Sequence, residues 1–138
     1  MNTFTKTSVT IAAAKVMIAA AETRAKELGI KISTCIVDES GVMKAFSSMD
    51  GAPLISIKAS HKKALTAVGF GLASGDGWFG FIKDDPILRE GAHNFDDFIL
   101  VGGGKPVMIN NILTGAIGIS GGHYKQDEDC ADAALKAL

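Results

Sequence analysis

The chain has 138 residues, of which 47% are hydrophobic and 21% charged, with 14 basic side chains against 15 acidic ones. This length predicts one domain, residues 1–138, with enough apolar surface for a single core. The net charge of -1 gives no long-range attraction to phosphate backbones, and no apolar run is long enough to cross a bilayer, so we expect neither a nucleic-acid nor a membrane partner.

The first predicted element is an amphipathic helix, which Thr7 or Ser8 caps and Gly29 ends. Its apolar positions between residues 9 and 21 recur at helical spacing. Residues 30–37 then alternate with the period of two that is typical of a strand. After a turn with the sequence Asp-Glu-Ser-Gly, residues 42–49 are expected to return beside that strand as an antiparallel hairpin.

A second helix is predicted to begin near Pro53 and to end by Gly71. Its expected basic outer side carries Lys58, Lys62 and Lys63. Residues 72–97 show no clear periodicity apart from a short helix at 86–90, which is typical of a functional loop or an interface segment. The aromatic residues of this stretch are expected to cover apolar surface, either in a pocket or between subunits. They are Trp78, Phe79, Phe81 and Phe95.

Three further strands are expected at residues 98–101, 107–109 and 112–119, followed by a last helix after Gly121 and Gly122. Asn110 and Asn111 tolerate the positive φ of a tight hairpin turn between the last two strands. Because hairpin signals outnumber βαβ patterns, the predicted fold class is α+β, a five-stranded antiparallel sheet with flanking helices.

The two cysteines, Cys35 and Cys130, lie far apart in the sequence, and the first residues do not read as a secretion signal. We therefore expect buried thiols and a cytoplasmic protein.

Several motifs resemble the GlcG/HbpS family: MDGAP at residues 49–53, GGGKPV at 102–107, and GAIGISGG at 115–122 followed by Gln126 and Asp127. The resemblance covers nearly the whole chain and implies a PAS- or profilin-like fold and a homo-oligomer. Its members include heme-binding proteins and the C-terminal domain of PduO-type proteins. Heme is therefore the cofactor that the resemblance implies, and ligand binding is better supported than any one reaction.

Noncovalent heme needs an axial ligand, usually a histidine, in an apolar pocket. His61, His93 and His123 are available. His123 follows Gly121 and Gly122, where backbone N–H groups can hold an anion while the imidazole moves a proton. His93 is a second candidate for acid–base work because it lies in the long loop. The alternatives are surface roles for His61 and His93 and a helix-starting role for His123.

Lys63 stands where the family carries a lysine and is a candidate to contact a carboxylate, although a solvated lysine is an equal alternative. Arg89 is a candidate to clamp a carboxylate, with Asp84, Asp85 and Glu90 as competing partners. The histidine spacing matches no metal-ligand motif, so no metal site is expected.

The sequence thus leaves three functions open. The first is a small-ligand-binding domain of the heme-binding type, with His61, Lys63, Arg89, Gly121 and Gly122 as its binding residues. The second is a cofactor-free lyase, isomerase or hydrolase that acts on a small aromatic or carboxylated metabolite through His123 or His93. The third is a structural oligomer subunit. Ligand binding is favoured, and whether the protein is an enzyme stays open.

Overall fold

The computed structural model describes residues 1–138, which form five α-helices, one 3-10 helix and four strands. In chain order these are α1 (Ile11–Leu28), β1 (Ser33–Asp38), β2 (Met43–Ser48), α2 (Ile55–Phe70), α3 (Asp76–Ile82), α4 (Pro86–Gly91), η1 (Ala92–Asn94), β3 (Gly104–Ile109), β4 (Ile112–Ser120) and α5 (Tyr124–Lys136). None of the helices combines the length and the apolar sequence that a membrane span requires.

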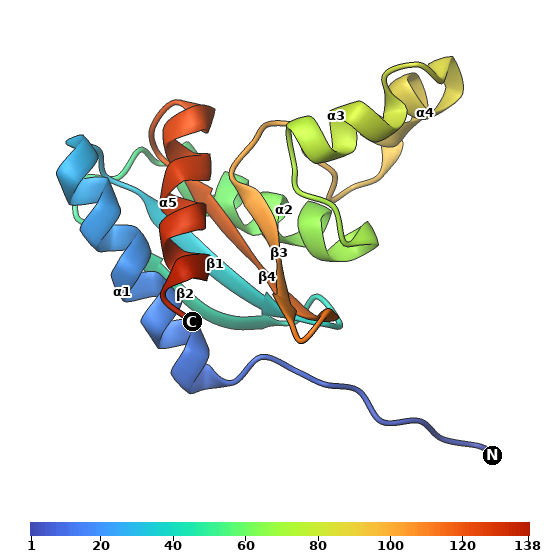
Figure 1. Ribbon diagram of the computed structural model, residues 1–138. Coiled ribbons are helices and arrows are strands. Elements are labelled where there is room, and N and C mark those ends of the chain that lie inside the picture. Colours follow the sequence, from blue (N-terminus) through green and yellow to red (C-terminus); the bar gives the residue numbers. More distant parts are fainter.

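The four strands form one antiparallel sheet in the order β2-β1-β4-β3, which confirms the α+β class. Helices α1 and α5 pack on one face of the sheet and α2 on the other (Figure 1). Strand β1 is central, so both of its faces are buried. Ile36 joins the core under α1 and α5, whereas Cys35 and Val37 join the core under α2. Successive side chains of β1 therefore alternate as predicted, but they point into two different cores instead of alternately into a core and into solvent.

The sheet has four strands and not the predicted five. The strand predicted at residues 98–101 is wrong, because this segment pairs with no strand. Its polar backbone groups bind elsewhere: the Ile99 N–H donates to the Thr66 hydroxyl on α2 at 2.9 Å, and the carbonyl of Leu100 accepts from the Gly75 N–H. The short apolar run therefore lies against a helix and a loop. Strand β3 begins at Gly104, three residues earlier than expected.

Residues 72–97 are more ordered than the predicted loop. They hold α3 as well as the expected short helix, α4, and the 3-10 turn η1. We call residues 72–98 the lobe, because they project beyond the C-terminal end of α2 (Figure 1). Helix α3 was not predicted, because its sequence, DGWFGFI, contains two glycines, which are weak helix formers.

The first helix also begins later than predicted. Its N-cap is Thr10, not Thr7 or Ser8, and the Thr10 hydroxyl accepts the Ala13 N–H at 3.1 Å. Gly29 ends the helix with a φ of 72°, as expected. Residues 1–8 form an extended arm that leaves the domain (Figure 1).

Helix α2 lies unusually close to the sheet, and a glycine makes this possible. A Cβ atom at Gly118 on β4 would collide with the backbone carbonyl of Ser60 on α2. Gly118 therefore allows the backbone of α2 to pack directly on the backbone of β4.

Candidate functional site

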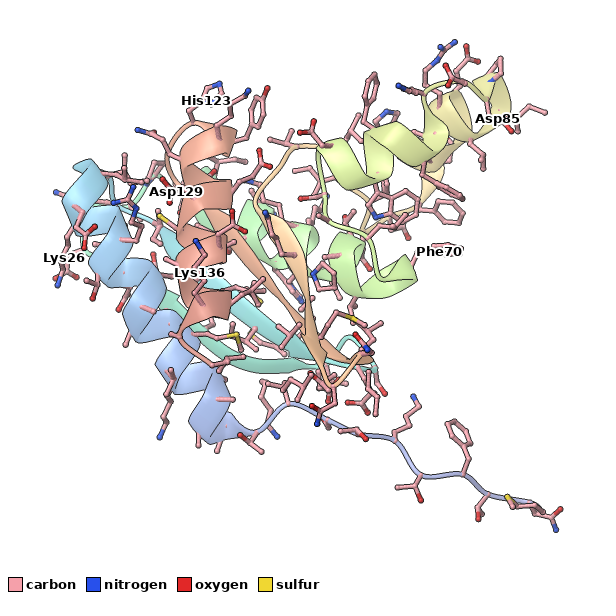
Figure 2. The ribbon with its side chains drawn as sticks, in the orientation of Figure 1. Lys26, Phe70, Asp85, His123, Asp129 and Lys136 are labelled. Carbon is pink, nitrogen blue, oxygen red and sulfur yellow. The ribbon has the colours of Figure 1, made fainter.

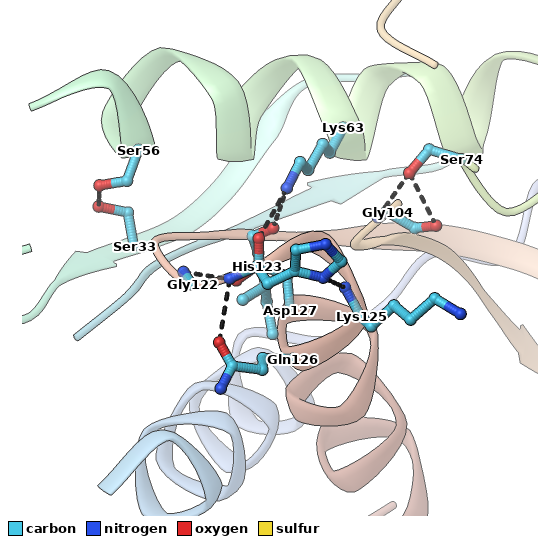
Figure 3. A network of polar contacts seen from close by, with 11 residues as sticks. Ser33, Ser56, Lys63, Ser74, Gly104, Gly122, His123, Lys125, Gln126 and Asp127 are labelled. Atoms are coloured by element: carbon cyan, nitrogen blue, oxygen red, sulfur yellow. Dashed lines mark hydrogen bonds and ion pairs between the residues drawn. The ribbon is translucent and has the colours of Figure 1, made fainter. Parts of the chain in front are cut away.

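The polar centre of the molecule is an ion pair between α2 and α5. The ammonium of Lys63 donates to Oδ2 of Asp127 at 3.0 Å and to the carbonyl oxygen of Ile119 at 2.9 Å (Figure 3). The two side chains are only 3% and 2% exposed. Lys63 was predicted to lie on the exposed basic side of α2, and this is wrong, because it faces the sheet together with Ser56 and Ser60. Lys58 and Lys62 are exposed, as predicted. The carboxylate that Lys63 contacts is the protein's own Asp127, so a contact of Lys63 with a ligand carboxylate stays a prediction.

Burial dominates the ionisation of this pair. Desolvation lowers the pKa of Lys63, and the nearby Asp127 charge opposes that shift. Desolvation likewise raises the pKa of Asp127, against the attraction of Lys63 and the hydrogen bond from Gly122. The two groups titrate as a coupled pair, so each keeps its charge only through the other. The pair joins α2 to the start of α5, although the two helices lie on opposite faces of the sheet, and neither of its two charges is free for a ligand.

Gly121, Gly122 and His123 surround the start of α5. Gly121 has a φ of 147° and packs against the backbone of Lys31, and the Gly122 N–H donates to Oδ1 of Asp127 at 2.9 Å. The anion at this helix start is thus the protein's own Asp127. A cofactor-binding role for the two glycines stays a prediction, since their contacts here are internal.

His123 is the N-cap of α5. Its Nδ1 accepts the Lys125 N–H at 3.1 Å, and its own N–H donates to the side-chain oxygen of Gln126 at 3.0 Å, which makes a capping box (Figure 3). The exposed ring lies beside Tyr124, with centroids 4.3 Å apart. The helix-starting role is therefore present, and the catalytic role of His123 stays a prediction.

A separate apolar groove lies between α2 and the lobe, with a volume of about 400 Å³. We call it the aromatic groove. Its apolar walls are Leu65 and Phe70 of α2 and Trp78, Phe95 and Phe98 of the lobe. Figure 2 shows Phe70 at the end of α2 next to the lobe, far from His123 at the start of α5.

The aromatic rings of the groove support one another. Trp78 meets Phe98 edge to face at 5.1 Å and Phe70 at 6.1 Å between ring centroids. The Trp78 indole N–H donates to the carbonyl oxygen of Thr66 at 3.0 Å, which fixes the ring against α2. Trp78 and Phe95 were predicted to be pocket or interface residues. Phe70 and Phe98 were not, because they lie in segments predicted as the end of a helix and as a strand.

Two of the predicted histidines lie next to this groove. His61 is half-buried on α2, one turn before the wall residue Leu65 and therefore on the same side of the helix. The ring of His93 on η1 packs edge to face against Phe98, with centroids 5.5 Å apart. The groove thus has an imidazole in contact with its wall at Phe98, that of His93, and a second, His61, one helical turn from its wall residue Leu65.

The remaining candidate, Arg89, lies on α4 away from the polar centre. Its guanidinium donates to the carbonyl oxygen of Lys83 at 3.1 Å, which ties α4 to the end of α3. It is exposed and makes no ion pair with Asp84, Asp85 or Glu90. A carboxylate clamp by Arg89 stays a prediction.

A larger hollow, about 590 Å³, lies between the end of α1 and β2. Only two of its eight lining residues are hydrophobic, and Glu22, Lys26 and Lys31 bring charges of both signs. Size alone would favour this hollow, but an apolar planar ligand is better held by the smaller aromatic groove, because binding sites combine mostly apolar walls with few polar groups.

Comparison with known proteins gives a consistent result. A family model described as haem degrading protein HbpS-like matches residues 9–136. A 15.0 kDa protein from the dhaT–dhaS intergenic region of Citrobacter freundii is 30% identical, over 93% of this chain and 90% of that protein. The crystal structure of protein ORFY of Klebsiella pneumoniae has a TM-score of 0.89 and 29% identity, over 99% of this chain and 94% of that one. A crystal structure of a PduOC–heme complex has a TM-score of 0.81 and 29% identity, over 95% of each chain.

Proposed function

Because this chain belongs to the HbpS-like family, we propose that it is a small-ligand-binding domain which takes heme, or a similarly flat apolar ligand, into the aromatic groove. One observation carries this proposal: four aromatic rings, those of Phe70, Trp78, Phe95 and Phe98, wall a groove of about 400 Å³. The PduOC structure that this chain resembles holds heme, which supports heme as the first ligand to test.

The residues of the groove fit the apolar part of heme. Aromatic walls suit a porphyrin face, and His61 and His93 are the two imidazoles beside wall residues, so they are the axial candidates. Asp96 and Asp97 also line the groove, so the heme carboxylates would have to point away from them toward solvent or toward Lys62. Bound heme would supply an iron centre and a strong visible absorption band.

The test uses the single tryptophan of the chain, Trp78, which lines the groove. Heme titration should quench Trp78 fluorescence and produce a Soret band at the same stoichiometry. Phe70→Ala and Phe95→Ala should weaken binding by about tenfold each, because each removes a wall of the groove. Phe79→Ala on α3 is the matched control, since Phe79 is a neighbouring exposed ring outside the groove. A Soret band without Trp78 quenching would place the ligand elsewhere.

His61→Ala and His93→Ala extend the test to the axial ligand. We expect loss of one of these imidazoles to shift the Soret maximum while the groove still holds the macrocycle. His123→Ala should leave the spectrum unchanged, because that imidazole caps α5. Unchanged spectra in both His61 and His93 variants would remove the axial roles without removing heme binding.

A second function, acid–base turnover of a small aromatic or carboxylated metabolite, is favoured by the contact of His93 with the groove wall at Phe98. It predicts turnover that His93→Ala abolishes, with no heme added. We further propose that residues 1–138 act as one domain, with a PAS- or profilin-like fold, in the cytoplasm. Free, buried Cys35 and Cys130 support a reducing compartment.

A further inference from the structure

The extended arm, residues 1–8, precedes the part of the chain that the family model matches. Val9 is buried, and its N–H donates to the carbonyl oxygen of Thr114 at 3.0 Å, so the base of the arm is fixed on β4. Beyond Val9 the chain runs outward (Figure 1), and the ring of Phe4 is 79% exposed. Thr3, Thr5 and Thr7 alternate with the other residues in a strand-like pattern.

The arm has a fixed direction, although it covers no apolar surface of its own domain. The Lys6 ammonium donates to the Ser40 hydroxyl at 3.2 Å in the β1–β2 turn. Lys6 also lies 6.0 Å from the centroid of the Phe4 ring. These contacts hold the inner half of the arm against the domain and present Phe4 to the outside.

An apolar hollow of about 570 Å³ lies at the same end of the molecule, between β3 and the C-terminal end of α5. We call it the β3–α5 hollow. Met108 and Leu138, two of its apolar lining residues, are 51% and 50% exposed. The Thr114 hydroxyl donates to the carbonyl oxygen of Val107, another lining residue, at 2.9 Å. Thr114 therefore contacts both the base of the arm and the wall of the hollow.

We propose that Phe4 of one copy of this chain inserts into the β3–α5 hollow of a second copy, and reciprocally. An extended arm reaches about 17 Å from Val9 to Phe4. Because arm and hollow lie at one end of the molecule, two copies related by a two-fold axis at that end can exchange arms. The bond from Lys6 to Ser40 holds the inner half of the arm on the β1–β2 turn and leaves Phe4 exposed, so the receiving hollow belongs to the second copy.

The other hollows fit Phe4 less well. The hollow between α1 and β2 carries Glu22, Lys26 and Lys31, which suit a polar occupant. The aromatic groove lies against α2, on the opposite face of the sheet from α1 and α5. No side chain that lines the β3–α5 hollow is charged, and burial of an aromatic ring there removes apolar surface of both copies from water.

A disulfide test addresses this contact directly. The double variant Phe4→Cys/Met108→Cys should give a covalent dimer under mild oxidation, which a reducing agent dissolves. The native Cys35 and Cys130 are buried and should not react. The control Phe4→Cys/Ile87→Cys places the second thiol on α4, at a position 83% exposed but far from the hollow. Equal cross-linking in the control, or none in the Met108 variant, overturns the proposal.

Sedimentation equilibrium of the full chain supplies the energetic test. Phe4→Ala and Met108→Lys should each weaken self-association by about tenfold or more, whereas Ile87→Ser should not change it. Circular dichroism checks that all three variants are folded. A full chain that stays monomeric at high concentration, or association that the Phe4 variant leaves unchanged, shows that the arm is a free tail and overturns the proposal.

Discussion

The indole N–H of Trp78 donates to the carbonyl oxygen of Thr66, while the hydroxyl of Thr66 accepts the N–H of Ile99. A single residue of α2 thus binds the first helix of the lobe and the segment that leaves it. Since Trp78 also walls the aromatic groove, the bond to Thr66 sets both the position of the lobe and the shape of the groove.

Trp78→Phe should loosen the lobe without unfolding the domain. The phenyl ring keeps most of the apolar contact but loses the hydrogen bond, which contributes about 1 kcal/mol. Trypsin should then cleave after Lys83 and Arg89, both in the lobe, faster than in the unmodified protein. Phe79→Leu is the control, because Phe79 lies on the same helix but outside the groove. Equal cleavage rates in all three proteins would contradict this prediction.

Lys63→Met should be strongly destabilising. It leaves the buried Asp127 carboxylate without its ion partner, and breaking such a pair costs about 3–5 kcal/mol in the free energy of unfolding. The double variant Lys63→Met/Asp127→Asn should recover part of the loss, because Asn still accepts the Gly122 N–H and carries no charge. Urea unfolding measures both values. If the double variant is no more stable than Lys63→Met, the unpaired charge of Asp127 is not the cause of the lost stability.

His123→Ala should shorten or fray the start of α5. It removes the acceptor for the Lys125 N–H, and loss of an N-cap costs about 0.5–2 kcal/mol. His123→Ser should retain most of the stability, because a serine hydroxyl fills the same role. Thermal unfolding distinguishes the variants. If the melting temperature of His123→Ser falls as far as that of His123→Ala, the capping role assigned to this residue is wrong.

The two thiols should be inert in the folded protein. Burial raises the pKa of Cys35 and of Cys130 from 9.0 to about 12. The thiolate fraction near neutral pH is then about a thousandfold smaller than in the unfolded chain. Reaction with a thiol reagent such as dithionitrobenzoate should therefore follow unfolding. Rapid modification of either cysteine in native buffer would contradict the burial that the structure shows.

The same shift predicts a pH dependence of stability. A thiol whose folded pKa lies above its unfolded pKa contributes stability that is present below pH 9.0 and is lost as the pH rises toward about 12. Melting temperatures should thus fall above about pH 9. Cys35→Ala should show a shallower fall over that range than the unmodified chain, which separates the thiol from other groups that titrate there.

Most of the helices and strands could be predicted because their signals are local. Gly29 ends α1 in the left-handed conformation, and Asn110 and Asn111 adopt φ values of 52° and 62° in the hairpin turn. The period of two at residues 30–37 predicted β1. The failed strand prediction has a non-local cause: the apolar run at 98–101 has strand composition, but the Ile99 N–H binds Thr66 of α2, 33 positions earlier, and no periodicity reveals that contact.

The sequence by itself determined the α+β class, the hairpins and the family motifs, since turn chemistry and apolar periodicity act between near neighbours. Only the tertiary structure decided that Lys63 lies buried on Asp127, 64 positions further along the chain, and that Gly118 lets α2 contact β4. It also decided that Phe70, Trp78 and Phe98 share a groove while His123 is bound to a helix start. Such contacts depend on how helices pack on both faces of the sheet, and a pattern along one chain carries no record of which distant side chains then meet.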